Sequence, residues 1–207
     1  MNVILKKYVP IVKMKNSTKH NKIKIIVLDR DGVVNQDSPF YIKTPSEWHA
    51  IAGSLDAIAK LNQAGFPVVV ATNQSGVARG YFTASELENI HNKMRDDVAN
   101  AGGHLDGVFV CPHGPQDDCA CRKPKPGLLL QIAKHFKVVP EEMLVVGDSM
   151  RDILAARAAG CKTIVLTKTG NGEKTLAAVG IDKLKDVKIF ADLATFVDDF
   201  LGAHALQ

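Results

Sequence analysis

Two aspartates lie one residue apart directly after an apolar run near the start of the chain. The run at residues 23–28 is followed by Asp29-Arg30-Asp31-Gly32, and Gly32 permits a sharp turn that keeps both carboxylates at one strand end. Two carboxylates in this arrangement can hold Mg²⁺ and can supply both a nucleophile and an acid/base. The same pattern also occurs as a polar turn that caps a strand, so its interpretation depends on other segments.

Two further apolar runs end in groups that suit a phosphate or a metal ion. Thr72 is followed by Asn73-Gln74-Ser75-Gly76, and a hydroxyl beside a turn of backbone N–H groups can bind a phosphate. Gly147-Asp148-Ser149 follows another run, with Asp152 one helical turn later, and Asp148 offers a further oxygen ligand for Mg²⁺. Taken singly, the first segment is also compatible with a plain strand-to-helix loop and the second with a helix N-cap.

A lysine on a stiffened loop completes this set of groups. Lys123 lies in Arg122-Lys123-Pro124-Lys125-Pro126, where the prolines cannot continue a helix and hold the segment in a fixed loop. Its ammonium group can neutralise a phosphoryl group, although the segment is also compatible with a solvated basic surface loop. Acids, a hydroxyl with backbone donors and a lysine, all at one sheet edge, together predict Mg²⁺-assisted phosphoryl transfer.

The elements that must position these groups alternate between short apolar runs and helical patterns. Strands are expected at residues 23–28, 67–71, 107–110, 143–146, 163–166 and 187–190. Helices are expected at residues 54–64, 84–101, 127–136, 150–159 and 192–201. This alternation predicts an α/β, Rossmann-like fold with a parallel sheet and helices on both faces. In such sheets ligands bind outside the carboxyl ends of the strands, which is where the candidate residues lie.

The four segments, taken in order, resemble the motifs of the haloacid dehalogenase superfamily. The matching residues are Asp29-x-Asp31-Gly32-Val33, Thr72, Lys123 and Gly147-Asp148-x-x-x-Asp152. The resemblance covers the chain from about residue 23 to the C-terminus. It implies that Asp29 is a nucleophile that forms an aspartyl-phosphate and that Asp31 is first general acid and then general base. It also implies that Asp29, the Asp31 carbonyl and Asp148 bind Mg²⁺, while Thr72 and Lys123 steady the phosphoryl group.

Three of the four cysteines cluster with a histidine in a metal-binding pattern. Cys111, His113, Cys119 and Cys121 form C-x-H-x₅-C-x-C, and three thiolates with one imidazole can complete a closed tetrahedral zinc site. The alternative is a set of reduced surface cysteines, which is uncommon in a cytosolic domain. We therefore expect a structural zinc ion. Cys161 begins an apolar run and is expected in the core.

This cysteine loop is similar to that of the zinc-bearing branch of small phosphatases in the same superfamily. Members of the branch act on heptose bisphosphate or on histidinol phosphate, and the residues around Asp29 and Thr72 are more similar to the former group. The resemblance therefore implies release of the 7-phosphate of heptose 1,7-bisphosphate, on the route to the nucleotide-activated heptose of lipopolysaccharide core. The short spacer from His113 to Cys119 is as in the histidinol-phosphatases, which are the alternative. The implied substrate contacts come from Asp37, Ser38, Pro39, Phe40, Thr72, Asn73, Gln74, Ser75, Arg122 and Lys123.

The spacing of the motifs leaves no room for a separate cap domain. Residues 31–72 are used by one loop and one helix, and residues 72–123 by a helix, a strand and the cysteine loop. We expect an open site, covered only by residues 37–46 and the cysteine loop.

Composition and charge limit the other classes of function. Hydrophobic residues make up 46% and charged residues 23%, as in a globular domain. Seven lysines and no acid lie in the first 24 residues, which leaves 19 basic against 22 acidic side chains elsewhere. We expect residues 1–22 to be a basic arm and residues 23–207 a single phosphatase domain. Neither a nucleic-acid partner, a membrane span nor a signal peptide is predicted. The expected protein is a cytoplasmic monomer, and the alternative of another class is an inactive zinc-loop interaction protein.

Overall fold

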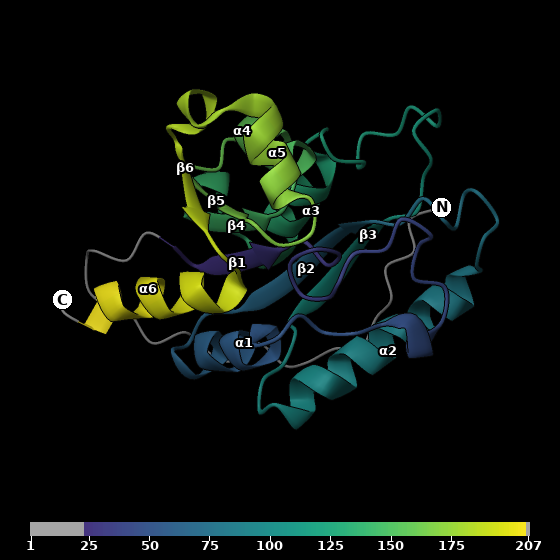
Figure 1. Cartoon of the computed structure of the whole chain (residues 1–207), viewed down its shortest axis with the longest axis horizontal. Coiled ribbons are helices and arrows are strands. Elements are labelled where there is room, and N and C mark those ends of the chain that lie inside the picture. Colours follow the sequence, from purple (N-terminus) through teal and green to yellow (C-terminus); the bar gives the residue numbers. More distant parts are fainter. Residues whose placement is uncertain (1–22, 206–207) are drawn as a thin grey trace.

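The computed structural model describes residues 23–205, in which six strands form one parallel sheet. Its order is β3-β2-β1-β4-β5-β6, so the first strand along the chain lies in the middle (Figure 1). The strands are β1 (Ile25–Leu28), β2 (Val68–Asn73), β3 (Gly107–Cys111), β4 (Met143–Gly147), β5 (Thr163–Thr167) and β6 (Val187–Phe190). All six strands predicted from the apolar runs are confirmed, with ends shifted by at most two residues. The expected basic arm at residues 1–22 lies outside the described residues.

Helices cover both faces of the sheet, as predicted (Figure 1). One face carries α1 (Ser54–Gln63), α2 (Ala84–Asn100) and α6 (Leu193–Ala205). The other carries α3 (Gly127–Phe136), α4 (Met150–Ala159) and α5 (Gly172–Val179). The sequence prediction missed α5 and the three 3₁₀ turns Pro45–Glu47, Pro140–Glu142 and Ile181–Leu184. Helix α5 has eight residues, begins at a glycine and has only two large apolar side chains, so it has little helical periodicity.

The sheet divides the hydrophobic core into two parts, and successive side chains of β1 point into opposite parts. Ile26 and Leu28 pack among the helices of one face, while Ile25 and Val27 pack among those of the other. All four side chains are buried, because a central parallel strand is covered on both sides. The apolar run in the sequence is therefore continuous rather than alternating, which fixes β1 as an inner strand.

The position of β1 creates the crevice in which the polar segments meet. Strand β1 pairs with β2 on one side and with β4 on the other, and the chain runs outward in both directions from it. The loops that follow these strands diverge at this switch point and leave a crevice at the carboxyl edge of the sheet. Residues 29–53, between β1 and α1, carry only the turn Pro45–Glu47 and isolated bridges, so no cap domain is inserted there. Within residues 23–205, no helix has the length and apolar character that crossing a membrane requires.

Candidate active site

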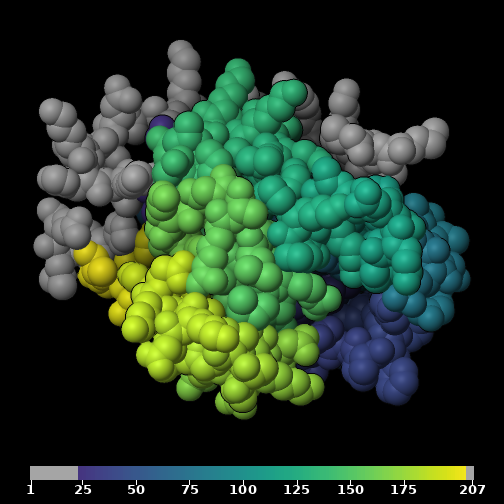
Figure 2. Space-filling view, turned by 90° about the horizontal axis from the view of Figure 1, so that it is seen from above, coloured from purple at the N-terminus to yellow at the C-terminus, as the bar shows by residue number. Residues whose placement is uncertain are grey.

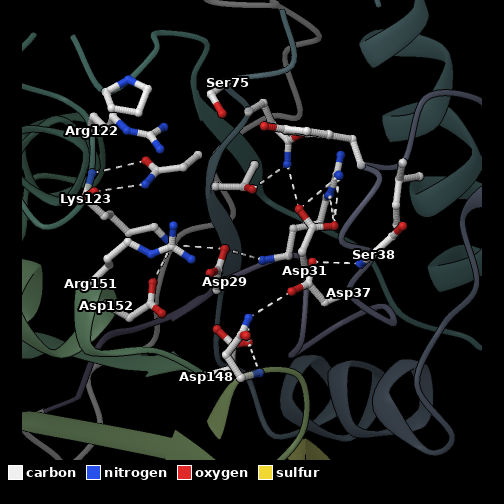
Figure 3. A pocket seen from close by; sticks show the side chains of 18 of the residues that line it. Asp29, Asp31, Asp37, Ser38, Ser75, Arg122, Lys123, Asp148, Arg151 and Asp152 are labelled. Carbon is white, nitrogen blue, oxygen red and sulfur yellow. Dashed lines mark hydrogen bonds and ion pairs between the residues drawn. The ribbon is translucent and has the colours of Figure 1, made fainter. Parts of the chain in front are cut away.

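A cavity of about 360 Å³ opens at the carboxyl edge of the sheet and collects most of the candidate residues (Figures 2 and 3). In the space-filling view, the blue segment near residue 40, the teal segment near residue 115 and the green segment near residue 170 adjoin around its mouth. The candidates in its lining are Asp29, Asp31, Asp37, Ser38, Thr72, Asn73, Gln74, Ser75, Arg122, Lys123 and Asp148. Pro39 and Phe40 are not among the lining residues, and Phe40 is 78% exposed. Their contact with a substrate stays a prediction.

Asp29 lies at the floor of the cavity, one residue beyond β1. Its Oδ1 accepts a hydrogen bond from the Arg30 backbone N–H at 2.7 Å and lies 3.0 Å from Lys123 Nζ. Burial raises the pKa of Asp29 well above its usual value; Lys123 opposes this, while Asp152, Asp148 and Asp31 add to it. A largely buried carboxylate that faces the cavity beside one ammonium group is placed to attack an electrophile there.

Lys123 links residues 29–33, here called the nucleophile loop, to the start of α4. Its Nζ lies 2.5 Å from Asp152 Oδ1 and donates a hydrogen bond to the Ala71 carbonyl at 2.9 Å, and its side chain is only 4% exposed. Although burial opposes protonation, Asp152 and Asp29 raise the pKa of Lys123 above its ordinary value, so the amine is charged. Asn73 fixes the lysine loop through two hydrogen bonds, to the Lys123 carbonyl at 3.0 Å and from its N–H at 3.1 Å.

Asp152 is a site residue to which the sequence argument gave no role beyond its place in a motif. Its Oδ2 accepts hydrogen bonds from the Ser149 backbone N–H at 3.1 Å and from the Ser149 hydroxyl at 2.6 Å. Burial raises the pKa of Asp152, but Lys123 outweighs this and holds it below its usual range. The signal for this role was its position one turn after Asp148, which puts both acids at the start of one helix.

Three carboxylates fit a hard divalent cation. Oxygen atoms of Asp29, Asp148 and Asp152 all lie within 4.8 Å of one another. Burial and the Asp152 charge raise the pKa of Asp148 to about 6, a sign that these acids repel one another. A divalent ion with oxygen ligands would remove this repulsion, and Mg²⁺ has that preference. The side chain of Asp31 is outside this cluster, which is compatible with its predicted contribution of a main-chain carbonyl.

The β5–α5 loop holds Asp148 and the nucleophile loop together, and glycines make this possible. A Cβ on Gly32, whose φ is +86°, would lie 2.1 Å from Asp148 Oδ2, and one on Gly170 would lie 2.2 Å from the same atom. The Asn171 N–H donates to Asp148 Oδ2 at 2.7 Å, and the Thr169 hydroxyl donates to the Gly32 carbonyl at 2.6 Å. No residue pattern in the sequence indicates this loop, because its contribution is made by backbone atoms and by the absence of side chains.

The covering segment after β1 is tied to the same loop. The Asn171 side-chain amide donates to Asp37 Oδ2 at 2.8 Å, which brings residues 37–46 over one side of the cavity. In the same segment, Tyr41 also lines the cavity and meets Tyr81 edge to face, with ring centroids 5.0 Å apart. The expected lid of short loops is therefore present on this side, and the cysteine loop with Pro115 and Arg122 lines the other.

The carboxylate of Asp31 points away from the acid cluster and is held by several donors (Figure 3). Asn35 Nδ2 donates to Oδ1 at 2.9 Å, and Gln74 Nε2 donates to Oδ2 at 2.8 Å. Gln74 Nε2 also lies 2.8 Å from the Thr72 hydroxyl, so one amide joins the first two motifs. Arg30 contacts the same carboxylate from within the core. A carboxylate fixed beside the nucleophile but outside the metal cluster suits acid/base work.

The four zinc candidates converge at the end of β3. The sulfur of Cys111 lies 3.7 Å from that of Cys119 and 3.3 Å from that of Cys121, and His113 Nδ1 lies 3.3 Å from the Cys121 sulfur. Ligands at Zn–S distances of about 2.3 Å in a tetrahedron are separated by about 3.7 Å, so the cluster fits one zinc ion. Burial raises the pKa of the Cys111 thiol, a cost that a bound cation would remove.

The chain is similar to known phosphatases over nearly their whole length. A family model described as haloacid dehalogenase-like hydrolase matches residues 40–160. The D-glycero-beta-D-manno-heptose-1,7-bisphosphate 7-phosphatase of Bordetella bronchiseptica is 51% identical over 179 residues, which cover 86% of this chain and 98% of that protein. The protein of the same name from Pseudomonas putida is 49% identical, with 86% and 100% covered.

A solved structure agrees with the fold as well as with the sequence. It is D,D-heptose 1,7-bisphosphate phosphatase from B. bronchiseptica complexed with magnesium and phosphate, at a TM-score of 0.83 and 50% identity, covering 87% of this chain and 99% of that one. The matched family model includes the segments that hold Thr72, Lys123 and Asp148. The chain therefore belongs to the haloacid dehalogenase-like hydrolases.

Proposed function

We propose that this protein is a phosphatase that releases the 7-phosphate of D-glycero-β-D-manno-heptose 1,7-bisphosphate through an aspartyl-phosphate on Asp29. The observation that carries the proposal is the floor of the cavity, where the Asp29 carboxylate faces the buried ammonium group of Lys123 beside two further acids. The name and the high identity of the relatives support the choice of substrate. As in the sequence argument, the product serves the synthesis of nucleotide-activated heptose.

The proposed mechanism has two steps. Asp29 Oδ attacks phosphorus, the bond to the sugar oxygen breaks, and Asp31 gives its proton to that oxygen. Asp31 then takes a proton from water, which attacks the phosphorus of the aspartyl-phosphate and regenerates Asp29 with release of phosphate. Lys123 and Thr72 bind the phosphoryl oxygens. Mg²⁺ held by Asp29, Asp148 and the Asp31 carbonyl, with Asp152 beside them, neutralises phosphoryl charge when bound.

The open cavity suits a bulky substrate with a primary phosphate. Only short loops cover the site, so a seven-carbon sugar can extend past Asp37 and Arg122 toward solvent. Two exposed arginines, Arg79 and Arg151, also line the cavity and give its outer part a positive character. That charge favours a substrate with a second phosphate over histidinol phosphate, which carries an ammonium group in place of one.

The test is a comparison of phosphate release from four compounds under the same conditions. These are the β and α anomers of the heptose bisphosphate, histidinol phosphate and 4-nitrophenyl phosphate. The β anomer should have the highest kcat/KM. A preference for histidinol phosphate would replace the substrate assignment with the alternative, and no release from any compound with Mg²⁺ present would support an inactive zinc-loop interaction protein.

A weak chelator should distinguish the two metal sites. Dialysis against a weak chelator should stop turnover reversibly by removing Mg²⁺ while leaving about one zinc per chain, because thiolates bind zinc far more tightly than carboxylates bind magnesium. Cys119→Ser should lose zinc, melt at a lower temperature, raise KM and lower kcat, since Arg122 and Lys123 follow Cys121 directly. Cys161→Ser, a buried cysteine outside the loop, is the control and should keep its zinc. Freshly purified protein without zinc would contradict the loop assignment.

Arg122 is expected to recognise the remote part of the substrate. It lines the cavity, but its Nη1 also donates to the His113 carbonyl at 3.1 Å, so it has a structural contact as well. Arg122→Ala should lower kcat/KM for the bisphosphate by about 10- to 150-fold, the worth of a charge-assisted contact of about 1.5–3 kcal/mol. The loss on 4-nitrophenyl phosphate should be much smaller. Arg122→Lys, which keeps the charge but not the planar fork, should fall between. A uniform loss on both substrates would leave Arg122 with a structural role only.

A further inference from the structure

Arg30 is a buried cation that the proposed mechanism does not use. It lies between the two aspartates of the nucleophile loop, and its side chain is 1% exposed. Its Nε donates to Asp31 Oδ1 at 3.1 Å, and its Nη2 lies 2.9 and 3.0 Å from Oδ1 and Oδ2. One edge of the guanidinium group therefore holds both oxygens of the Asp31 carboxylate. A buried arginine needs partners for its remaining N–H groups, because an unpaired donor in the core is costly.

The partner on the other edge comes from a distant part of the chain. Arg30 Nη1 lies 3.2 Å from Nε2 of His91, which is 61 residues later on α2 and 1% exposed. Burial, followed by the charges of Arg30 and Arg95, lowers the pKa of His91 well below its usual value. The lowered pKa agrees with the geometry, since a guanidinium group has no acceptor and Nε2 of His91 must accept the hydrogen bond from Nη1.

Among the buried side chains of α2, His91 is the polar one. His91 lies on the face of α2 that packs into the core, together with the buried side chains of Leu87, Ile90 and Met94. The other buried positions of α2 are occupied by apolar side chains. The imidazole instead faces Arg30, so α2 reaches the site through one polar side chain.

The Asp31 carboxylate, in contrast, is still accessible from the cavity. Its side chain is 23% exposed, and the residue lines the cavity beside Asp29. Asn35 and Gln74 contact one oxygen each, whereas Arg30 contacts both. Rotation of the carboxylate about its Cβ–Cγ bond is therefore limited by the guanidinium group, whose own orientation depends on His91.

We propose that His91 and Arg30 are positioning residues, which hold the Asp31 carboxylate where it can exchange a proton with the leaving oxygen of the substrate. This inference rests on the proposed function, in which Asp31 is the acid and base. His91 acts through Arg30 and touches neither the substrate nor the reacting atoms. Loss of the imidazole acceptor frees the guanidinium group to turn, and the Asp31 carboxylate moves with it.

The experiment compares leaving groups that differ in their need for a proton. His91→Leu removes the acceptor, and His91→Gln places an amide oxygen at a similar reach. Each is measured for kcat/KM on the heptose bisphosphate, a poor leaving group, and on 4-nitrophenyl phosphate, a good one. His91→Leu should lose about 10- to 100-fold on the sugar ester, as small displacements of catalytic groups do, and less than about threefold on the aryl ester. His91→Gln should recover most of the loss. Ile90→Val, which removes one methyl group from the same helix, should leave the ratio of the two substrates unchanged.

A double-mutant cycle separates positioning from a merely structural effect. In an Asp31→Asn background, His91→Leu should have little further effect on kcat/KM, because the group through which it acts is gone. An equal loss on both substrates, a full additional loss in the Asp31→Asn background, or a His91→Gln variant as poor as His91→Leu would each overturn the proposal. If His91→Leu does not fold, His91→Asn, whose amide is too short to reach Arg30, takes its place against His91→Gln.

The outcomes also distinguish this proposal from the proposed function. A wild-type protein inactive on the heptose bisphosphate would rule out the substrate assignment only. The double-mutant cycle of Asp31 and His91 would then be measured on an alkyl phosphate that the protein does hydrolyse. An Asp31→Asn variant that loses as much on the aryl ester as on the alkyl ester would end the acid/base assignment and the positioning role together. A selective loss for Asp31→Asn without one for His91→Leu would end the positioning role alone.

Discussion

Replacing Asp29 with asparagine should abolish turnover of every phosphate ester, with a loss of more than about a thousandfold in kcat, as for other nucleophiles. The amide has nearly the same shape as the carboxylate but cannot attack phosphorus. The fold should persist, because Lys123 keeps its contacts with Asp152 and the Ala71 carbonyl. Phosphate release and acid-quench trapping of the phosphorylated protein measure the loss directly.

The stability of this variant gives an independent check on the site. Burial and the neighbouring acids raise the pKa of Asp29, so its ionised form is disfavoured in the folded protein without metal. A raised carboxylate pKa reduces stability at neutral pH, and the neutral amide avoids that cost. The metal-free variant should therefore melt at least as high as the metal-free wild type. Asp96→Asn, an exposed acid in the interior of α2, is the control and should change neither property. Activity above a tenth of wild type would rule out Asp29 as the nucleophile.

Asp31→Asn should reduce turnover nearly as strongly, but in a way that depends on the leaving group. Asparagine cannot donate a proton to the sugar oxygen, and general acid catalysis contributes about 10²- to 10⁴-fold. The loss in kcat/KM should be in that range for the heptose bisphosphate and several-fold smaller for 4-nitrophenyl phosphate, whose leaving group needs little protonation. The comparison uses kcat/KM because this constant reports the phosphorylation step for both substrates.

Asp29→Asn is the matched control for the second prediction, since loss of the nucleophile must affect both substrates alike. The Asn35 and Gln74 amides can turn to suit asparagine, but the buried Arg30 guanidinium has only donors and loses its counter-charge, so Asp31→Asn should also melt at a lower temperature and both esters are compared at a temperature at which it is folded. An Asp31→Asn variant with the same fractional loss on both esters would show that this residue does not protonate the leaving group.

The sequence was sufficient to predict the sheet and the functional residues at or just after the ends of its strands. Continuous apolar runs identify inner parallel strands, and the functional groups follow these runs directly, so local pattern and site coincide. Helix α5 was missed because its eight residues carry too few apolar side chains for a helical period. It is held instead by tertiary contacts, among them the Asn171 N–H that binds Asp148 at its start.

Contacts between distant residues account for what the sequence could not predict at the site. His91 reads as one polar residue in an amphipathic helix, and nothing near it in the sequence indicates a buried arginine 61 residues earlier. Asp152 was visible in its motif, but its 2.5 Å contact with Lys123 depends on how the lysine loop folds over α4. The side-chain orientation of Asp31, away from the acids and toward Arg30, is likewise set by tertiary packing.

The central place of β1 has a consequence for how the protein is made. The strand that carries the nucleophile pairs with β4, and Ile25 lies opposite Met143. During synthesis at about 5–20 residues per second, β1 leaves the ribosome roughly 6 to 24 seconds before its partner does. Over that interval β1 lacks one of its two neighbouring strands, and it can pair only with β2. We therefore expect folding to begin with β1, β2 and β3 and the helices α1 and α2, with hydrolysis becoming possible only once β4 and the β5–α5 loop have joined them.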